Sequence, residues 1–247
     1  MMQDTPATEP LVFIHGSGDS AQSWDAVIAR LPGYDTLALS LPGHGDRLDR
    51  PGPSDMSVAD YAAAVRAALA RRALTRVALV GHSLGSAIAL WMALEYPALI
   101  GRIVLIGAGA RMRVAPGFLA AARDDPAAGG SELVHIGYAP GHEAQATTYF
   151  DALTPLAPGM LLRDLTACDA FDVMADLGRV AQPALIITGE SDRLTPPKYA
   201  AYLRDHLEHA QLELVPGAGH YVQVEAPDAV AAAIRGWLAR VPERERQ

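Results

Sequence analysis

The segment Gly81-His82-Ser83-Leu84-Gly85 has the pattern G-x-S-x-G, in which a serine hydroxyl can act as a nucleophile. An apolar run with β-branched residues precedes this pentapeptide and a helical pattern follows it, which is the strand–turn–helix context that the motif requires. The alternative interpretation is a glycine-rich turn whose serine only caps the next helix. The flanking context favours Ser83 as a nucleophile at the end of a strand.

A serine hydroxyl is a weak nucleophile near neutral pH and needs a base that accepts its proton. We predict His220 as this base, because it lies in a glycine-rich segment directly after the last apolar run. The imidazole in turn needs an acid that orients it. Asp192, a few residues after the apolar run 184–188, is the predicted acid, and Glu190 is the competing candidate.

Short apolar runs alternate with longer helical patterns, which predicts βαβ units and a mostly parallel sheet flanked by helices, the α/β fold class. The carboxyl ends of parallel strands meet at one edge of a sheet, so residues that follow different strands can come together there. We expect six strands, at residues 11–14, 36–39, 76–80, 103–106, 184–188 and 212–215. We expect helices from Ser57 to Arg72, from the end of the Gly81–Gly85 segment towards Tyr96, and from about Ala229 to Arg240.

The alternation breaks over residues 111–180, where helical patterns with proline and glycine breaks occur without a convincing strand. A loop of roughly 70 residues is rarely structureless in a compact domain. We therefore predict an α/β core formed by residues 1–110 and 181–247, and a helical insertion at 111–180. Apolar residues of the insertion would line a pocket, and no arginine pair that could bind a carboxylate is evident in it.

Four segments in this order give the chain a resemblance to the α/β-hydrolase family over nearly its whole length. His15-Gly16-Ser17-Gly18 is similar to the oxyanion loop of that family, and 189–192 and 217–220 are similar to its acid and histidine loops. Leu41-Pro42-Gly43-His44-Gly45 is similar to a further loop, although Ser40 stands where that family commonly has aspartate. The resemblance implies an α/β-hydrolase fold with the insertion as a cap, and a shortened N-terminal end.

The same resemblance implies the roles of individual residues. It implies a catalytic triad in the chain order Ser83, Asp192, His220. It also implies an oxyanion hole formed by the backbone N–H groups of Ser17 and Leu84. The resemblance implies structural roles for three further histidines. His15 and His44 would brace the loops near the oxyanion hole, and His82 would pack beneath the turn at Ser83.

We therefore predict a serine esterase that cleaves a small to medium, neutral carboxylic ester through an acyl-enzyme intermediate. Cleavage of C–C bonds or lactones, and cofactor-free haloperoxidase activity, use the same triad and stay open as alternatives. A ligand receptor with a slow triad is the alternative outside enzymes. Dehalogenases and epoxide hydrolases of this fold use an aspartate nucleophile, and Ser83 in that position argues against both.

The composition of the chain indicates which classes of binding partner, location and cofactor to expect. The formal net charge is −8 over 247 residues with no Lys/Arg run, so nucleic acid and anionic membrane surfaces are not expected to bind. The N-terminus has no signal-peptide pattern, and Cys168 is the single cysteine, so we expect a cytoplasmic location. No H-E-x-x-H pattern occurs, and no metal or cofactor is expected. The sequence leaves open whether the protein is a monomer or a dimer.

Overall fold

Six parallel strands form the central sheet of the computed structural model, which describes residues 9–48, 52, 54–153 and 156–241. The strand order is β2-β1-β3-β4-β5-β6, and every neighbouring pair is parallel. The strands are β1 (Leu11–Ile14), β2 (Thr36–Leu39), β3 (Val77–His82), β4 (Ile100–Ile106), β5 (Ala184–Gly189) and β6 (Ala210–Val215). The predicted parallel sheet and the α/β class are thus confirmed.

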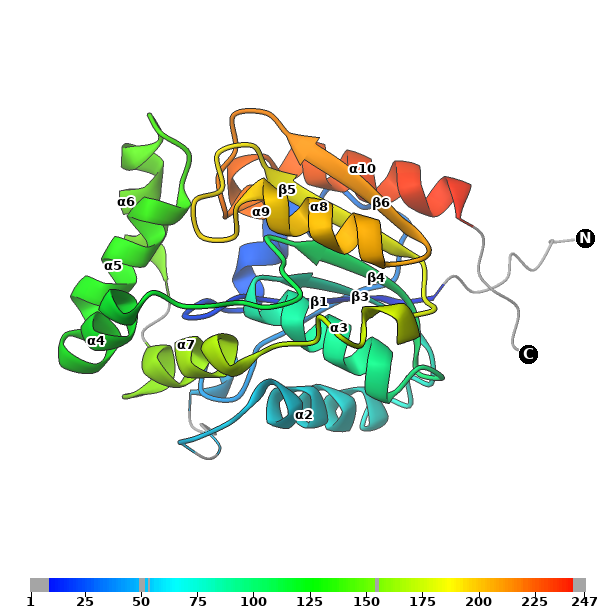
Figure 1. Ribbon diagram of the computed structural model, residues 1–247, viewed down its shortest axis with the longest axis horizontal. Helices are drawn as coiled ribbons and strands as arrows, with labels where there is room; N and C mark the ends of the chain where they lie inside the picture. Colours follow the sequence, from blue (N-terminus) through cyan, green and yellow to red (C-terminus); the bar gives the residue numbers. More distant parts are fainter. Residues whose placement is uncertain (1–8, 49–51, 53, 154–155, 242–247) are drawn as a thin grey trace, which may run out of the picture.

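Helices cover both faces of the sheet (Figure 1). Helices α2, α3 and α8 pack on one face, while α1, α9 and α10 lie over the other. The helices are α1 (Asp25–Ile28), α2 (Val58–Ala70), α3 (Leu84–Glu95), α4 (Pro116–Asp124), α5 (Pro126–Gly137), α6 (Glu143–Ala152), α7 (Met160–Ala170), α8 (Pro197–His206), α9 (Val222–Glu225) and α10 (Pro227–Arg240), with 3-10 turns η1 (Ala21–Trp24), η2 (Gly45–Arg47) and η3 (Leu177–Arg179). None of the described helices is long and apolar enough to cross a bilayer.

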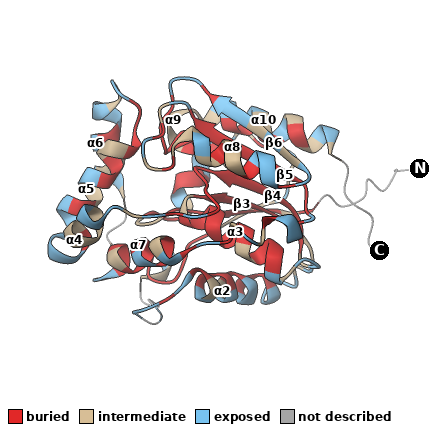
Figure 2. Cartoon of the chain, viewed as in Figure 1, coloured by how far each residue is buried: buried red, intermediate tan, exposed pale blue. Residues whose placement is uncertain are grey.

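The central strands are apolar on both faces because both faces are covered. Every residue of β1, β3, β4 and β5 is buried, whereas the edge strand β6 is largely exposed (Figure 2). In β1, Val12 and Ile14 point to the layer with α2 and α3, and Leu11 and Phe13 point to the layer with α10. Continuous apolar runs are typical of parallel strands that are buried in this way.

Strand β4 begins three residues before its predicted start at residue 103. The predicted strand stopped there because Gly101 and Arg102 interrupt the apolar run. In the structure the buried guanidinium of Arg102 lies 3.6 Å from the Glu9 carboxylate, so a charge is tolerated within the strand. The predicted shortening of the N-terminal end falls on residues 1–8, which lie outside the described part of the chain.

Helices α4 to α7 come from the predicted insertion and lie beyond the carboxyl ends of the strands (Figure 1). The two ends of this segment meet in an antiparallel bridge between Arg111 and Asp172. The same two side chains form an ion pair with a distance of 2.6 Å. The chain thus leaves and returns at one place, and the helices between Arg111 and Asp172 extend over the edge where the motif loops lie.

We expect Gly85→Ala to destabilise the protein, because α3 packs against the backbone of β1 at this glycine. A Cβ at Gly85 would lie 2.2 Å from the carbonyl oxygen of Ile14. Overpacking of this kind should lower the free energy of unfolding by about 2 kcal/mol or more, measured by urea denaturation. Gly117→Ala in α4 is the matched control, because its Cβ would enter open space. Equal stability of the two variants would contradict the packing argument.

Candidate active site

Ser83 occupies a sharp turn between β3 and α3. Its backbone has φ 51° and ψ −114°, a conformation that L-residues with a side chain rarely adopt. The Ser83 N–H donates to the carbonyl of Ile106 at 2.9 Å, and the Ser86 hydroxyl donates to the carbonyl of Ser83 at 2.6 Å. The turn therefore stores strain that the surrounding bonds maintain, as at other functional sites.

The glycines that flank Ser83 are required by close backbone approaches. A Cβ at Gly81 would lie 2.1 Å from the carbonyl oxygen of Gly85, which leaves no room for a side chain. The loop after β1 also comes close, because a Cβ at Gly16 would lie 3.2 Å from the Cβ of Ser83. The G-x-S-x-G pattern is thus a steric requirement of the turn.

His220 and Asp192 form the second part of the site. The Nδ1 atom of His220 lies 2.9 Å from Oδ2 of Asp192 and 3.1 Å from the hydroxyl of Thr195. Both side chains of the pair are buried. With Nδ1 directed to the carboxylate, Nε2 is the ring nitrogen that remains for a substrate or a hydroxyl. The structure therefore brings together these two residues, which are 28 positions apart in the sequence.

The Asp192 carboxylate is held in its ionised form. It accepts the backbone N–H groups of Leu194 and Thr195 at 2.9 and 2.8 Å, and the Thr195 hydroxyl at 2.8 Å. Burial alone would raise the pKa of Asp192, but His220 and these donors outweigh it and keep the pKa below its ordinary value. Glu190, the competing acid, is exposed and lies before this cluster of donors. The geometry thus favours Asp192.

The predicted oxyanion donors lie on either side of Ser83. Leu84 is the first residue of α3, and Ser17 follows Gly16 in the loop after β1. In the described ranges, neither the Ser17 N–H nor the Leu84 N–H donates to a protein acceptor. Two unpaired N–H groups beside a serine are what a developing oxyanion requires.

The described structure contains no hydrogen bond between Ser83 and the His220 ring. Both residues line one cavity of about 170 Å³ near the carboxyl ends of the strands. Catalytic hydrogen bonds are often absent in ligand-free structures and form when substrate is bound. The structure therefore brings Ser83 and His220 to one cavity without a hydrogen bond between them.

Two other buried histidines contact the loops around Ser83, as the resemblance implied. His15 accepts the N–H of Leu41 at Nε2 and donates from Nδ1 to Gly16, at 2.9 and 2.8 Å, so its ring is neutral. Burial lowers the pKa of His15 to about 3, which agrees with that assignment. His82 donates to the carbonyl of His220 at 3.0 Å, and the centres of these two rings are 4.8 Å apart. The His15 and His82 rings thus fix the positions of the loops next to Ser83 and His220.

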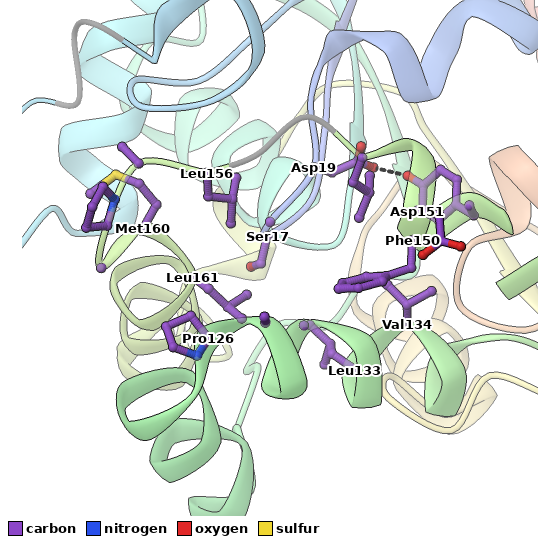
Figure 3. A pocket seen from close by; sticks show the side chains of 18 of the residues that line it. Ser17, Asp19, Pro126, Leu133, Val134, Phe150, Asp151, Leu156, Met160 and Leu161 are labelled. Carbon is purple, nitrogen blue, oxygen red and sulfur yellow. Dashed lines mark hydrogen bonds between the residues drawn. The ribbon is translucent and has the colours of Figure 1, made fainter. Parts of the chain in front are cut away.

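A second, larger cavity of about 490 Å³ lies between the loop after β1 and helices α5, α6 and α7. Ser17, Leu133 and Tyr221 line both cavities, so the two spaces adjoin at the predicted oxyanion loop. Figure 3 shows Ser17 and Leu161 at the wall of the larger cavity. Most of its other lining side chains are apolar, and they include Val134, Phe150, Leu153, Leu156 and Met160.

Sequence reasoning missed several residues of the site. Thr195 was not identified, although a hydroxyl shortly after a catalytic acid is a local signal that could have indicated it. Arg113 of the insertion and Arg193 of the sheet domain both line the smaller cavity, a combination that the search for an arginine pair within 111–180 did not consider. Arg193 donates to the carbonyls of His135 and Tyr138 at 3.2 and 3.3 Å. The two arginines are far apart in the sequence, so no pattern could reveal the pair.

The described residues contain no group of three or more His, Cys, Asp or Glu side chains arranged to hold a metal ion. Cys168 is buried on α7, and its Sγ lies 3.7 Å from the Ser17 hydroxyl. Burial raises the pKa of Cys168 to about 12, so its thiol is protonated near neutral pH. This cysteine is therefore a packing residue beside the oxyanion loop.

Comparison with known proteins identifies the family of the chain. Residues 11–233 match the family described as "Alpha/beta hydrolase family". The chain is 27% identical to a pimeloyl-[acyl-carrier protein] methyl ester esterase of Neisseria meningitidis, with 95% of each chain covered. It is 30% identical to a 2-succinyl-6-hydroxy-2,4-cyclohexadiene-1-carboxylate synthase of Enterobacter sp., covering 91% of this chain and 89% of the relative.

A solved thermophilic esterase shares 30% identity and a TM-score of 0.79, with 93% of this chain and 89% of the esterase covered. A protein of Mycobacterium tuberculosis is 39% identical over 100 residues, which span 40% of this chain and 29% of that protein. The chain therefore belongs to the alpha/beta hydrolase family, and the proteins that it is similar to include esterases.

We expect the buried carboxyl group of Asp19 to make the free energy of unfolding depend on pH. Asp19 lines the larger cavity and accepts the Tyr149 hydroxyl at 2.6 Å. Burial raises the pKa of Asp19 from 3.8 to about 6. Because the folded chain binds this proton more tightly, the stability that it contributes is lost as the pH rises from about 4 to about 6. We expect Asp19→Asn to be more stable than wild type at pH 8, by about 1–3 kcal/mol.

Urea denaturation at pH 8 and pH 5 tests this expectation, and the gap should narrow at pH 5. The matched control is Asp151→Asn, which changes an exposed carboxylate on the wall of the same cavity. A gap of equal size at both pH values would show that charge burial is not the cause.

Proposed function

We propose that this chain is a serine esterase that cleaves a small to medium carboxylic ester through an acyl-enzyme intermediate. The observation that carries the proposal is the strained turn at Ser83 on the wall that also holds the buried His220–Asp192 pair. A strained nucleophile, a base with a free Nε2 and an orienting carboxylate are the three groups that acyl transfer by serine needs.

The reaction would proceed in two halves. Ser83 Oγ attacks the ester carbonyl while His220 Nε2 accepts its proton, and the N–H groups of Ser17 and Leu84 bind the oxyanion. The tetrahedral intermediate collapses, the C–O bond to the alcohol breaks, and the imidazolium gives its proton to the departing alcohol. Water then attacks the acyl-Ser83 ester with the same base, which releases the acid and restores the serine.

In this proposal residues 111–180 act as a cap, and the two cavities receive the two arms of the ester. The apolar lining of the larger cavity supports an ester with at least one uncharged, apolar arm. The relatives named as a methyl ester esterase and a thermophilic esterase support ester chemistry in general. The cavities adjoin at Ser17, so the carbonyl oxygen would lie at their junction.

A second candidate is cleavage of a C–C bond or a lactone in a carboxylate-bearing substrate. Arg113 and Arg193 on the wall of the smaller cavity favour it, because guanidinium groups bind carboxylates. The relative named as a carboxylate synthase is similar to this chain over most of its length. A panel of p-nitrophenyl esters, lactones and dienoates, compared by kcat/KM, separates this candidate from the proposed esterase.

Ser83→Ala should abolish hydrolysis of p-nitrophenyl acetate. The change removes the nucleophile but leaves the strained turn, so we expect at least a 1,000-fold loss of kcat, on the order seen when a triad member is removed. The measurement is steady-state kinetics with matched circular dichroism spectra. Ser131→Ala on α5 is the control, because that serine is not among the lining residues of either cavity. If Ser83→Ala retained wild-type turnover, the nucleophile would be another group.

A receptor with a slow triad predicts a different outcome for wild-type protein. Turnover would be negligible on every ester of the panel, while ligands would raise the melting temperature of wild type and Ser83→Ala alike. Readily measured wild-type turnover that depends on Ser83 excludes that alternative.

Asp192→Asn should lower kcat by roughly 1,000-fold or more while the fold is retained, because an amide favours the wrong imidazole tautomer. Glu190→Gln changes the exposed neighbouring acid and should leave kcat close to the wild-type value. Steady-state kinetics on both variants makes the test. A large loss in Glu190→Gln with an active Asp192→Asn would transfer the orienting role to Glu190.

A further inference from the structure

The loop after β1, which contains the predicted oxyanion donor Ser17, is hydrogen-bonded to a buried carboxylate of helix α7. Asp164 of α7 is fully buried, and its Oδ2 accepts the backbone N–H of Gly18 at 3.0 Å. The two residues are 146 positions apart, so this bond joins the insertion to the loop after β1. We propose that Asp164 is a positioning residue that sets the oxyanion hole, an inference that rests on the proposed esterase function.

The bond acts on the residue next to the predicted oxyanion donor. Gly18 has φ +72°, so the chain turns sharply directly after Ser17. Fixing the Gly18 N–H limits rotation of the peptide plane between these two residues, and through it the backbone of Ser17. Two further contacts from α7 reach the same loop: Cys168 Sγ lies 3.7 Å from the Ser17 hydroxyl, and Leu161 would lie 3.3 Å from a Cβ at Gly18.

The charge on Asp164 is balanced by His44. The Nε2 of His44 lies 2.8 Å from Asp164 Oδ2, and its Nδ1 lies 3.1 Å from the carbonyl oxygen of Pro42. Both ring nitrogens thus face acceptors, which requires an imidazolium. Burial alone would lower the pKa of His44, but the contact with Asp164 outweighs it and raises the pKa above the ordinary value.

The other oxygen of Asp164 belongs to a separate support. Oδ1 accepts the hydroxyl of Tyr61, and the same phenol oxygen accepts the Nε–H of Arg163 at 2.7 Å. Arg163 also donates to the carbonyl of Pro42 at 2.5 Å. Asp164 therefore has one oxygen directed to the oxyanion loop and His44, and one directed to Tyr61 on α2. These two functions can be separated by mutation.

An ionised acceptor suits this task better than a neutral one. Hydrogen bonds to a carboxylate are shorter and stronger than those to a neutral oxygen, so the N–H of Gly18 is held firmly. Without this acceptor the Gly18 N–H and the His44 imidazolium would lose their shared partner in the interior. The loop would then shift, and a displacement of about 1 Å can cost on the order of 100-fold in rate.

The test compares Asp164→Ala, Asp164→Asn and Tyr61→Phe in the full chain. We expect Asp164→Ala to lower kcat on p-nitrophenyl acetate by about tenfold to 100-fold with little change in KM, because the oxyanion forms only in the transition state. Asp164→Asn retains a neutral acceptor for Gly18 and should show an intermediate kcat. Tyr61→Phe removes the hydroxyl that donates to Oδ1 and accepts the Nε–H of Arg163 but leaves the Oδ2 contacts, so the melting temperature should fall while kcat stays near wild type.

A second readout separates positioning from general destabilisation. A trifluoromethyl ketone adds to the serine and carries an oxyanion, so its inhibition constant should rise in parallel with the loss of kcat in the Asp164 variants. Tyr61→Phe should bind this inhibitor as wild type does. If Asp164→Ala does not fold, the comparison of Asp164→Asn with Tyr61→Phe decides, and a threefold or larger loss of kcat confined to Asp164→Asn is required.

The results distinguish this inference from the proposed function. If the Asp164 variants lose melting temperature but keep wild-type kcat and inhibitor affinity, Asp164 is only a structural link and the inference is wrong. If wild-type protein shows no Ser83-dependent turnover and no inhibitor binding, the proposed esterase function itself fails.

Discussion

The active site depends on one steric constraint, which is the close approach of three backbone segments around Ser83. The loop after β1, the end of β3 and the first turn of α3 meet within contact distance, and Gly16, Gly81 and Gly85 provide the space. The resulting turn holds Ser83 at a positive φ that isolated chains rarely adopt. The rest of the sheet domain serves to maintain this packing, with strands β1 and β3 paired directly beneath it.

Buried imidazoles around this turn differ in charge because their partners differ. His15 accepts one N–H group and donates to one carbonyl, so it is neutral, whereas His44 faces two acceptors and is cationic. The Nδ1 atom of His220 contacts a carboxylate, and His220 also lines the smaller cavity. The chemical identity of the residue is the same in each place, and the hydrogen-bond partners decide whether it braces a loop, balances a charge or is suited to accept a proton.

The helices of 111–180 lie over the sheet edge and also contact the loop after β1. They form most of the wall of the larger cavity and also contact the oxyanion loop through α7. Substrate selection and the geometry of catalysis would then share one structural element in the proposed enzyme. Because Asp164 also contacts His44 and Tyr61, the position of α7 is tied to the sheet domain by buried polar bonds as well as by apolar packing.

Local patterns were sufficient for the sheet and for the candidates Ser83, Asp192 and His220. Apolar periodicity and turn glycines act over a few residues, so the strand positions and the start of α2 near Ser57 could be predicted from the sequence. The start of β4 could not, because only the pairing of Arg102 with Glu9 makes that charge acceptable in a strand.

The sequence by itself determined the class of fold, the insertion of helices and the residues that could do acyl chemistry. The tertiary structure paired Asp192 with His220, brought Arg113 and Arg193 to one cavity, and joined Asp164 to Gly18. These contacts link segments that are distant along the chain. Their energies depend on burial and on the arrangement of partners in space, and no local pattern of residues records either quantity.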